Sequence, residues 1–396
     1  MKYSSIVSTL RVWAITRFLG LFFLFAGIAT PAAAQNQDVI DAFARQVAAD
    51  VEADGIGAIT AAVFKGDQVL WAQGFGWADP DKRVPAGVRT IYRTGSISKS
   101  FTAVLMADLM EDGVLALDDP IEATLPEVAH FAEAPPGMEP ITYRQFASHT
   151  AGLIQEPELE GAASGPIEDW GHKILTSIPH TRYYTMPGTK YQYSNIAYGV
   201  LGYTLQRATG ASFIELVEDR IFGPLGMNSS TFIVGPDLSR RLSVGFANRS
   251  PFVADGVVDA RTPALEHEGR GYKVPNGGVY STVGDLATFG AAVMGYTEFE
   301  LLEPTTREEV MRWQTPPDGP GYSLGFFIDR VTLPNASEAR FVGHGGGVSG
   351  YNAYLVFEPE SGWGVVMLRN YNGGQTNLGG ASDALLTQLV GGIKEQ

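Results

Sequence analysis

YRTGSISKSF, at residues 92–101, is the most informative segment of this chain. In it, Ser96 precedes Lys99 by three positions, which is an S-x-x-K pattern. Three residues make nearly one helical turn, so a helix that starts at Ser96 would place the hydroxyl and the amine on one face. A serine hydroxyl becomes a good nucleophile when a neighbouring base takes its proton, and a lysine can be that base when burial disfavours its charged form. The pattern therefore predicts a nucleophile and its base, and it places Ser98 on the other side of the helix.

The first 34 residues have the features of an export signal. Three basic residues and no acidic ones accompany an apolar run at residues 18–29, and three alanines end the segment at Ala34. The apolar run is shorter than the ~20 residues that a membrane-spanning helix needs. We therefore expect cleavage near Ala34 and a periplasmic or secreted protein without a stable membrane anchor. A signal that stays uncleaved is the alternative.

The composition limits the classes of protein to consider. Of the 396 residues, 43 are acidic and 28 are Lys or Arg, which gives a formal net charge of −15. Such a polyanion does not follow phosphate backbones, so we expect no nucleic-acid partner. No cysteine is present, which excludes disulfides and thiolate catalysis. Residues 35–396 exceed the ~250–300 residues at which one hydrophobic core stops growing, so two structural parts are expected.

Hydrophobic periodicity predicts strands towards both ends of residues 35–396 and helices between them. The expected helices are residues 38–54, 96–113 and 381–393, and the expected strands are residues 59–64, 68–75, 322–331, 352–358 and 364–369. Residues 121–270 show helices and loops broken by Pro and Gly. The pattern indicates one α/β domain, built from residues 35–120 and 271–396, with a mostly helical part inserted. Clefts between such parts are common places for sites.

Two further segments carry groups that are suited to catalysis. In residues 193–195, the phenol of Tyr193 can relay protons and the amide of Asn195 can hold a substrate carbonyl. Other tyrosines crowd this stretch, so aromatic packing is the alternative reading. Residues 343–347 read GHGGG, and consecutive glycines let a substrate approach backbone N–H groups, which suits an oxyanion hole. The alternative there is a glycine-rich bend beside a strand.

Together and in this order, the three segments resemble the marks of the serine penicillin-recognising family. That family comprises class C β-lactamases, DD-peptidases and family VIII carboxylesterases, and its marks are S-x-x-K, Y-x-N and K-T-G or H-x-G. They stand here at residues 96–99, 193–195 and 344–346, with weaker similarity at residues 148–153 and 277–282. The resemblance covers nearly all of the chain after the signal. It implies an antiparallel sheet flanked by helices, with an inserted and mostly helical domain.

The resemblance also implies a role for each reactive side chain. Ser96 would attack a carbonyl and form an acyl-enzyme that water later cleaves. Lys99 would accept the serine proton or keep Tyr193 as a phenolate. Tyr193 would be the general base in acylation and would donate a proton to the leaving group. No metal and no organic cofactor is implied.

On the substrate side, the resemblance implies that Asn195 and the glycine segment hold the substrate. The backbone N–H groups of Ser96 and Gly347 would form the oxyanion hole, with His344 and Gly346 beside the substrate. His344 takes the place of the lysine of K-T-G, and glycines replace the hydroxyl-bearing residues that help to hold a substrate carboxylate. His344 can donate to a carboxylate as a cation only when it is protonated. A buried carboxylate without charge-assisted donors is costly, which argues against an efficient β-lactamase.

A second serine motif competes with Ser96. Residues 321–325 read GYSLG and fit G-x-S-x-G, and Asp329 and His344 follow Ser323 in Ser-Asp-His order. A nucleophile elbow, however, needs a strand before the serine and a helix after it. Ser323 instead follows a proline-rich segment and begins a strand-like run, so we expect it to be a structural serine.

The leading prediction is an exported serine hydrolase that acts through an acyl-enzyme on Ser96. Cleavage of amide or peptide bonds near D-amino acids, as in DD-peptidases, is the first expected activity on a small-molecule or peptide substrate. Ester hydrolysis of the family VIII type is the alternative, and weak β-lactam turnover could accompany either. A hypothesis of another class is a non-catalytic relative, either a receptor for cell-wall fragments or a structural protein.

Overall fold

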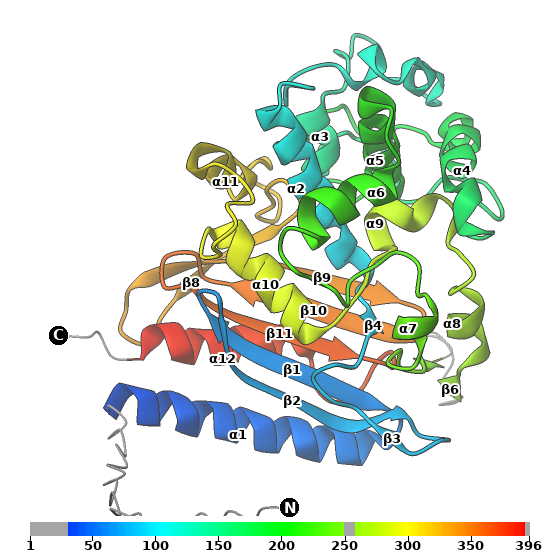
Figure 1. Ribbon diagram of the computed structural model, residues 1–396. Coiled ribbons are helices and arrows are strands. Elements are labelled where there is room, and N and C mark those ends of the chain that lie inside the picture. The colour runs from blue at the N-terminus through cyan, green and yellow to red at the C-terminus, as the bar shows by residue number, and fades with distance from the viewer. Residues whose placement is uncertain (1–30, 249–257, 393–396) are drawn as a thin grey trace, which may run out of the picture.

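The computed structural model describes residues 31–248 and 258–392 (Figure 1). The apolar run of the predicted export signal, at residues 18–29, lies outside the described residues. The predicted cleavage segment falls in the first helix, α1 (Pro31–Asp54). In the described parts of the chain, we find no helix with the length and apolar character that crossing a bilayer requires.

The molecule is built on a seven-stranded sheet in the order β3-β2-β1-β11-β10-β9-β8, in which neighbouring strands pair antiparallel. The strands are β1 (Ala58–Lys65), β2 (Gln68–Asp79), β3 (Val84–Pro85), β8 (Phe327–Thr332), β9 (Glu338–Val348), β10 (Tyr351–Phe357) and β11 (Trp363–Arg369). β1 joins the two ends of the chain, because it pairs with β2 on one side and with β11 on the other. Two short pairs lie apart from this sheet: β4 (Tyr92–Arg93) with β7 (Tyr280–Ser281), and β5 (Ala247–Asn248) with β6 (Val258–Asp259).

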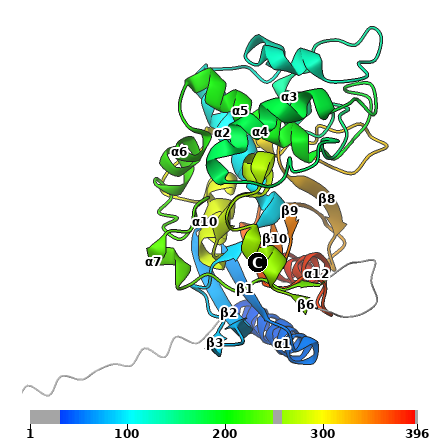
Figure 2. The same ribbon diagram turned by 90° about the vertical axis from the view of Figure 1, so that its right-hand side faces the viewer.

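Helices cover both faces of the sheet (Figures 1 and 2). After α1 they are α2 (Ser98–Glu111), α3 (Tyr143–Ala147), α4 (Trp170–Ser177), α5 (Asn195–Thr209), α6 (Phe213–Val217), α7 (Pro236–Ser239), α8 (Arg261–Leu265), α9 (Val274–Gly277), α10 (Val283–Met294), α11 (Pro304–Val310) and α12 (Leu378–Gly391). α1 and α12 lie on one face, and α10 and the helical part with α3 to α6 lie on the other. The predicted fold class, an antiparallel sheet flanked by helices together with a mostly helical region, is confirmed.

The residue pattern of β1 shows why two helical layers are needed. Successive side chains of a strand point to opposite faces. Ala61 and Val63 join the core under α1 and α12, whereas Ala62 and Phe64 join the core under α10. Because both faces of β1 are buried as far as Phe64, its sequence reads as an apolar run interrupted by Thr60 rather than as an alternation.

α2 connects the sheet to the helical part and carries the S-x-x-K pattern at its start. Its Phe101 ring packs 5.3 Å from the Phe222 ring of the helical part and 4.0 Å from the Phe289 ring of α10, measured between ring centroids. The residues of α2 from Ser98 to Leu109 are buried except Asp108. A helix enclosed on all sides in this way holds its first turn in a fixed position.

Two sequence predictions were wrong in detail. The α-helix begins at Ser98 and not at Ser96, which lies in a preceding 3-10 turn, η1 (Gly95–Ile97). The alternative reading of residues 343–347 as a glycine-rich bend beside a strand was wrong, because these residues are themselves part of β9. Glycine lowers strand propensity, so this segment does not read as a strand locally. Pairing with β10 overrides that preference, with His344 opposite Leu355.

Candidate active site

The turn η1 exposes Ser96 at the start of α2. Residues 91–100 are buried except Ser96, which is half-buried. Gly95 has a φ of +55°, which disfavours a side chain there. Ser98 fixes the turn, because its Oγ donates to the Gly95 carbonyl (2.7 Å) and accepts from the Val279 N–H (3.1 Å). The Ser96 hydroxyl is therefore presented on a rigid turn at a helix N-terminus, where the helix dipole favours developing negative charge.

The structure brings Ser96, Lys99 and Tyr193 together. Lys99 Nζ lies 3.1 Å from Ser96 Oγ, and the Tyr193 hydroxyl donates to the same oxygen over 2.8 Å. Ser96 is the middle residue of η1 and Lys99 is the second residue of α2, so nearly one helical turn separates them and their side chains lie on the same side. Both distances are within the range of a nucleophile and its proton-transfer partners.

Lys99 is placed to act as a neutral amine. Its side chain is fully buried, and this burial lowers its pKa well below the usual value, with Lys273 and Arg270 adding to the effect and Glu156 opposing it. Nζ also bonds Asn195 Oδ1 (2.7 Å) and the Asn276 carbonyl (3.3 Å). A neutral amine donates its two protons to these two oxygens and turns its lone pair to the Ser96 hydroxyl.

Tyr193 is placed to act as a neutral phenol. Burial raises the pKa of its hydroxyl to about 12, although the hydrogen bond to Ser96 opposes the rise. A protonated phenol donates to Ser96 Oγ and leaves the serine proton free to point at Lys99. Of the two proton routes that the family resemblance leaves open, these pKa directions favour Lys99 as the base that takes the serine proton.

Asn195 is held by two residues that the sequence analysis did not identify, and a third residue, Lys273, bonds one of them. Its Nδ2 donates to Glu156 Oε1 (2.6 Å), and its backbone carbonyl accepts from Asn276 Nδ2 (2.7 Å). Lys273 Nζ donates to the same Glu156 oxygen over 3.0 Å. The amide is thereby fixed with Oδ1 towards Lys99. Glu156 lies just beyond the segment 148–153 and Asn276 lies just before the segment 277–282. Both segments show weak similarity to the family, but neither residue belongs to the similar part.

The glycine segment of β9, for which the sequence predicts an oxyanion hole, lies directly against η1. β8 pairs with β9 as far as Gly343, and beyond it the backbone of β9 meets the Ser96 turn. A Cβ on Gly95 would lie 2.7 Å from the Gly347 nitrogen. A Cβ on Gly346 would overlap the Thr94 carbonyl oxygen and lie 3.2 Å from the Ser96 nitrogen. Glycine at both positions is thus what lets Gly347 approach Ser96.

This close approach leads to a stability prediction for Gly346→Ala. The added methyl group has no room against the Thr94 backbone, so we expect the free energy of unfolding to fall by about 1–3 kcal/mol. Gly345→Ala is the matched control, because its methyl group would make ordinary contacts, 3.4 Å from the Tyr354 ring and 4.0 Å from the Ala353 carbonyl oxygen. Urea unfolding of both variants measures the difference. Equal midpoints for the two variants would show that the contact does not constrain the strand.

His344 lies near the cluster of Ser96, Lys99 and Tyr193, and its ring is neutral. Its pKa is lowered to about 3 by burial and by Lys99. Nδ1 lies 2.6 Å from the Gly345 carbonyl and must donate to it, and Nε2, 3.0 Å from the Tyr322 hydroxyl, then accepts. Both ring nitrogens are engaged, so His344 supplies no positive charge for a substrate carboxylate.

Ser323 lies in a buried turn before β8 and not at a nucleophile elbow. Its backbone N–H and its Oγ both donate to the Phe326 carbonyl, over 2.8 and 3.2 Å. β8 follows at Phe327, where an elbow would require a helix. His344 is bonded to the neighbouring Tyr322. The geometry thus supports the structural reading of Ser323.

An antiparallel sheet with a serine–lysine–tyrosine cluster at the start of a buried helix defines the class of β-lactamase-fold hydrolases. The chain belongs to the Beta-lactamase family, whose model matches residues 43–388. The resemblance that the three motifs suggested is thereby confirmed.

Individual relatives agree with this assignment. The chain is 25% identical over 373 residues to the D-alanyl-D-alanine-carboxypeptidase/endopeptidase AmpH of Escherichia coli (strain K12), with 89% of each chain covered. In fold it resembles the octameric penicillin-binding protein homologue from Pyrococcus abyssi, with a TM-score of 0.70, 23% identity, and 89% of this chain and 76% of the other covered. It also resembles a D-stereospecific amidohydrolase from Streptomyces sp., with a TM-score of 0.68, 24% identity, and 89% and 99% covered.

Proposed function

We propose that this protein is a serine hydrolase that acts through an acyl-enzyme on Ser96. The observation that carries the proposal is the position of Ser96 Oγ, within hydrogen-bond distance of both a buried Lys99 amine (3.1 Å) and the Tyr193 hydroxyl (2.8 Å). A serine needs a base to become nucleophilic, and a leaving group needs an acid. The two neighbours of Ser96 supply one of each.

Acylation uses both neighbours. The Ser96 proton passes to the neutral Lys99 amine as Oγ attacks the substrate carbonyl, and the N–H groups of Ser96 and Gly347 receive the oxyanion. Tyr193 then gives its proton to the departing group. Its phenolate is stabilised at this stage by the new Lys99 ammonium, since an adjacent cation favours the charged form.

Deacylation returns both protons. The Tyr193 phenolate takes a proton from water as the water oxygen attacks the acyl carbonyl. Lys99 gives its extra proton back to Ser96 Oγ as the ester bond breaks. The products are the free acid and the resting cluster, so the cycle needs no other proton donor or acceptor.

The first substrate class that we propose is an amide or peptide next to a D-amino acid, as in DD-peptidases. The support for it is the activity named for AmpH and the one named for the Streptomyces amidohydrolase. Weak β-lactam turnover would accompany it. Export to the periplasm or beyond belongs to the same proposal, because such substrates would be met there.

An ester substrate is the second candidate, and one feature of β9 favours it. The neutral His344 and the glycines around it offer no charge-assisted donor to a substrate carboxylate. A carboxylesterase of the family VIII type does not need that donor. A non-catalytic receptor for cell-wall fragments is a proposal of another class, and absence of turnover would support it.

A three-substrate panel tests these proposals. A D-Ala-D-Ala peptide, short-chain p-nitrophenyl esters and a chromogenic cephalosporin are each offered to the wild type and to Ser96→Ala. We expect Ser96-dependent hydrolysis of the peptide, with slower cephalosporin turnover. Hydrolysis of the esters alone would select the esterase, and acylation without turnover of any of the three would select the receptor.

The ion pair between Glu156 and Lys273 gives a further prediction, because its two charges act on Lys99 in opposite directions. Glu156→Gln removes a charge that raises the Lys99 pKa, so the acidic limb of the pH–kcat/KM profile should move to lower pH. Lys273→Met removes a charge that lowers the same pKa, so the limb should move to higher pH. Glu156→Ala also frees the Asn195 amide, and we expect a loss of roughly 10–100-fold in kcat/KM, the value of one hydrogen bond to a charged group. Shifts in the same direction for the two charge variants would contradict this electrostatic role.

A further inference from the structure

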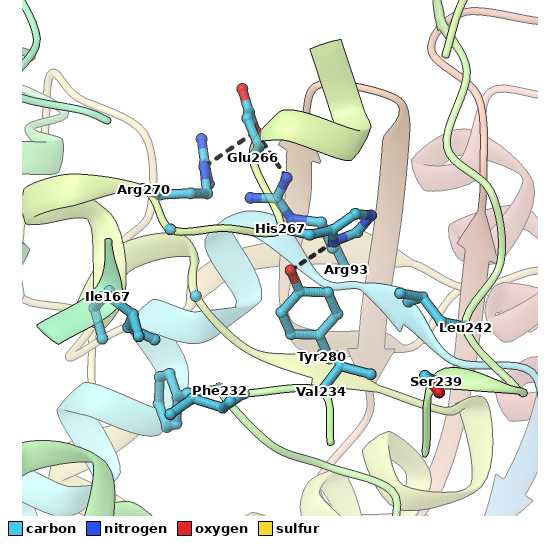
Figure 3. A pocket seen from close by; sticks show the side chains of 14 residues that line it. Arg93, Ile167, Phe232, Val234, Ser239, Leu242, Glu266, His267, Arg270 and Tyr280 are labelled. Atoms are coloured by element: carbon cyan, nitrogen blue, oxygen red, sulfur yellow. Dashed lines mark hydrogen bonds and ion pairs between the residues drawn. The ribbon is translucent and has the colours of Figure 1, made fainter. Parts of the chain in front are cut away.

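A pocket of about 230 Å³ is lined by Arg93, which precedes the turn that carries Ser96 in the sequence, and by residues between 266 and 280 (Figure 3). β4 and β7 contribute Arg93 and Tyr280, and the segment after α8 contributes Glu266, His267 and Arg270. The Ser96, Lys99 and Tyr193 cluster is not part of its lining. The catalytic proposal therefore leaves this pocket without a role.

The pocket contains two buried guanidinium groups and one carboxylate. Arg93 Nη1 lies 2.8 Å from Glu266 Oε2, and Arg270 Nε lies 3.2 Å from the same oxygen. Figure 3 shows the two guanidinium groups around that carboxylate. The side chains of Arg93 and Arg270 are only 1% and 13% exposed. Buried charges are costly unless they are paired, and here two cations share one anion.

The other titratable groups near Arg93 and Arg270 do not neutralise the second positive charge. The carboxylate of Glu156 also acts on Arg270, but Glu156 is ion-paired with Lys273. Burial and Arg93 lower the pKa of His267 to about 4, so this ring is neutral, and its Nδ1 lies 2.7 Å from the Tyr280 hydroxyl. The pocket thus carries a formal excess of one positive charge inside an acidic protein.

Apart from Ser239 and the glycines Gly269 and Gly278, the remaining walls of the pocket are apolar. They are formed by Ile167, Phe232, Ile233, Val234, Leu242 and Val274. We propose that the pocket binds a small organic carboxylate, which pairs with Arg93 and Arg270 while its hydrocarbon chain packs on Phe232 and Val234. A monoanion matches the single excess charge better than a phosphate monoester, which carries about −1.5 to −2. The apolar walls match a hydrocarbon body.

The pocket borders the candidate active site through two residues. Arg270 Nη1 donates to the Gly277 carbonyl over 3.2 Å and fills the space that a Cβ on Gly277 would occupy. The carbonyl of the preceding residue, Asn276, contacts Lys99. The carboxylate can therefore belong to a free acid or to the far end of a substrate held at Ser96.

The first experiment measures binding by calorimetry and does not depend on hydrolysis. Hexanoate is the probe, and hexanamide is its uncharged match. We expect the wild-type full chain to bind hexanoate at least tenfold more tightly than hexanamide. We expect Arg270→Gln to bind hexanoate at least tenfold more weakly than the wild type does. Arg312→Gln is the control, since that side chain is 60% exposed and pairs with Glu309 outside the pocket. Its affinity for hexanoate should equal that of the wild type.

A second variant keeps the proposal testable if Arg270→Gln does not fold. Ile233 is 55% exposed at the pocket, and Ile233→Trp should fold and block it. Hexanoate binding should then fall at least tenfold. Equal binding of hexanoate and hexanamide, or unchanged hexanoate binding in Ile233→Trp or in a folded Arg270→Gln, would overturn the proposal.

Two p-nitrophenyl esters distinguish a free acid in the pocket from the far end of a substrate held at Ser96. This experiment rests on the proposed hydrolase function. An adipate monoester carries a free carboxylate at its far end, and a hexanoate ester does not. A tenfold preference in kcat/KM for the adipate ester, lost in Arg270→Gln, assigns the pocket to the substrate. Equal rates with hexanoate binding intact assign it to a free acid. If neither ester is hydrolysed, the hydrolase proposal is weakened for esters while the binding experiment still decides the pocket.

Discussion

Replacing Ser96 with alanine is expected to lower kcat/KM for any hydrolysed substrate by about 10⁴-fold or more. Losses of this size are typical when a catalytic nucleophile is removed, because the remaining groups only bind the substrate and polarise it. The variant should also form no covalent adduct with an active-site serine probe, and intact-mass spectrometry measures this directly. The fold should survive, since Ser96 is half-buried and, within residues 31–248 and 258–392, its hydroxyl bonds Lys99 and Tyr193 alone.

Ser323→Ala is the matched control for this experiment. It removes a hydroxyl that donates to the Phe326 carbonyl within a buried turn, so it affects packing and not chemistry. We expect it to be labelled by the probe as the wild type is. An adduct that persists in Ser96→Ala and disappears in Ser323→Ala would assign the chemistry to the second motif.

Replacing Lys99 with methionine should produce the second largest loss, about 10³-fold or more in kcat/KM, because general-base catalysis contributes about 10²–10⁴-fold and two proton steps use this amine. In the proposed mechanism the neutral Lys99 amine is the active form. Activity should therefore be full above the lowered Lys99 pKa and should fall as the pH drops through it. The pH–kcat/KM profile measures this limb, and Lys99→Met should lose it.

Lys99→Arg is the control for charge. It restores a cation at this position, but a guanidinium does not deprotonate in a protein and so cannot accept the serine proton. We expect it to be as inactive as the methionine variant. An acidic limb that stays at the same pH in Lys99→Met would indicate that another group, with Tyr193 the nearest, is the base.

The local sequence pattern predicted those contacts of the site that join residues close together in the chain, and it missed contacts between distant residues. Ser96 and Lys99 are three residues apart, so helical geometry alone predicted their contact. Tyr193 bonds Ser96 across 97 positions, and only the family pattern of motifs pointed to it. Glu156 and Lys273 meet across 117 positions through the packing of loops. No local pattern marks such a pair.

The fold shows the same division. The apolar runs of β1, β10 and β11 and the amphipathic α1 were predicted from their hydrophobic pattern, because burial selects it residue by residue. β9 was not predicted, because its glycines are selected by a close backbone contact with η1 and not by strand propensity. The division into an α/β part and a helical part at residues 120 and 270 stays a prediction.

The contact between Gly95 and Gly347 joins segments that are far apart in the sequence, and so ties the proposed site to long-range folding. During synthesis, Ser96 and Lys99 are made well before the β9 backbone that faces them, and β1 is made well before β11, with which it pairs. Contacts of such long sequence separation form late in folding because loop closure costs entropy. If Ser96 is the nucleophile that we propose, an unfolded chain should therefore not react with an active-site serine probe, and reactivity should arise together with the native state.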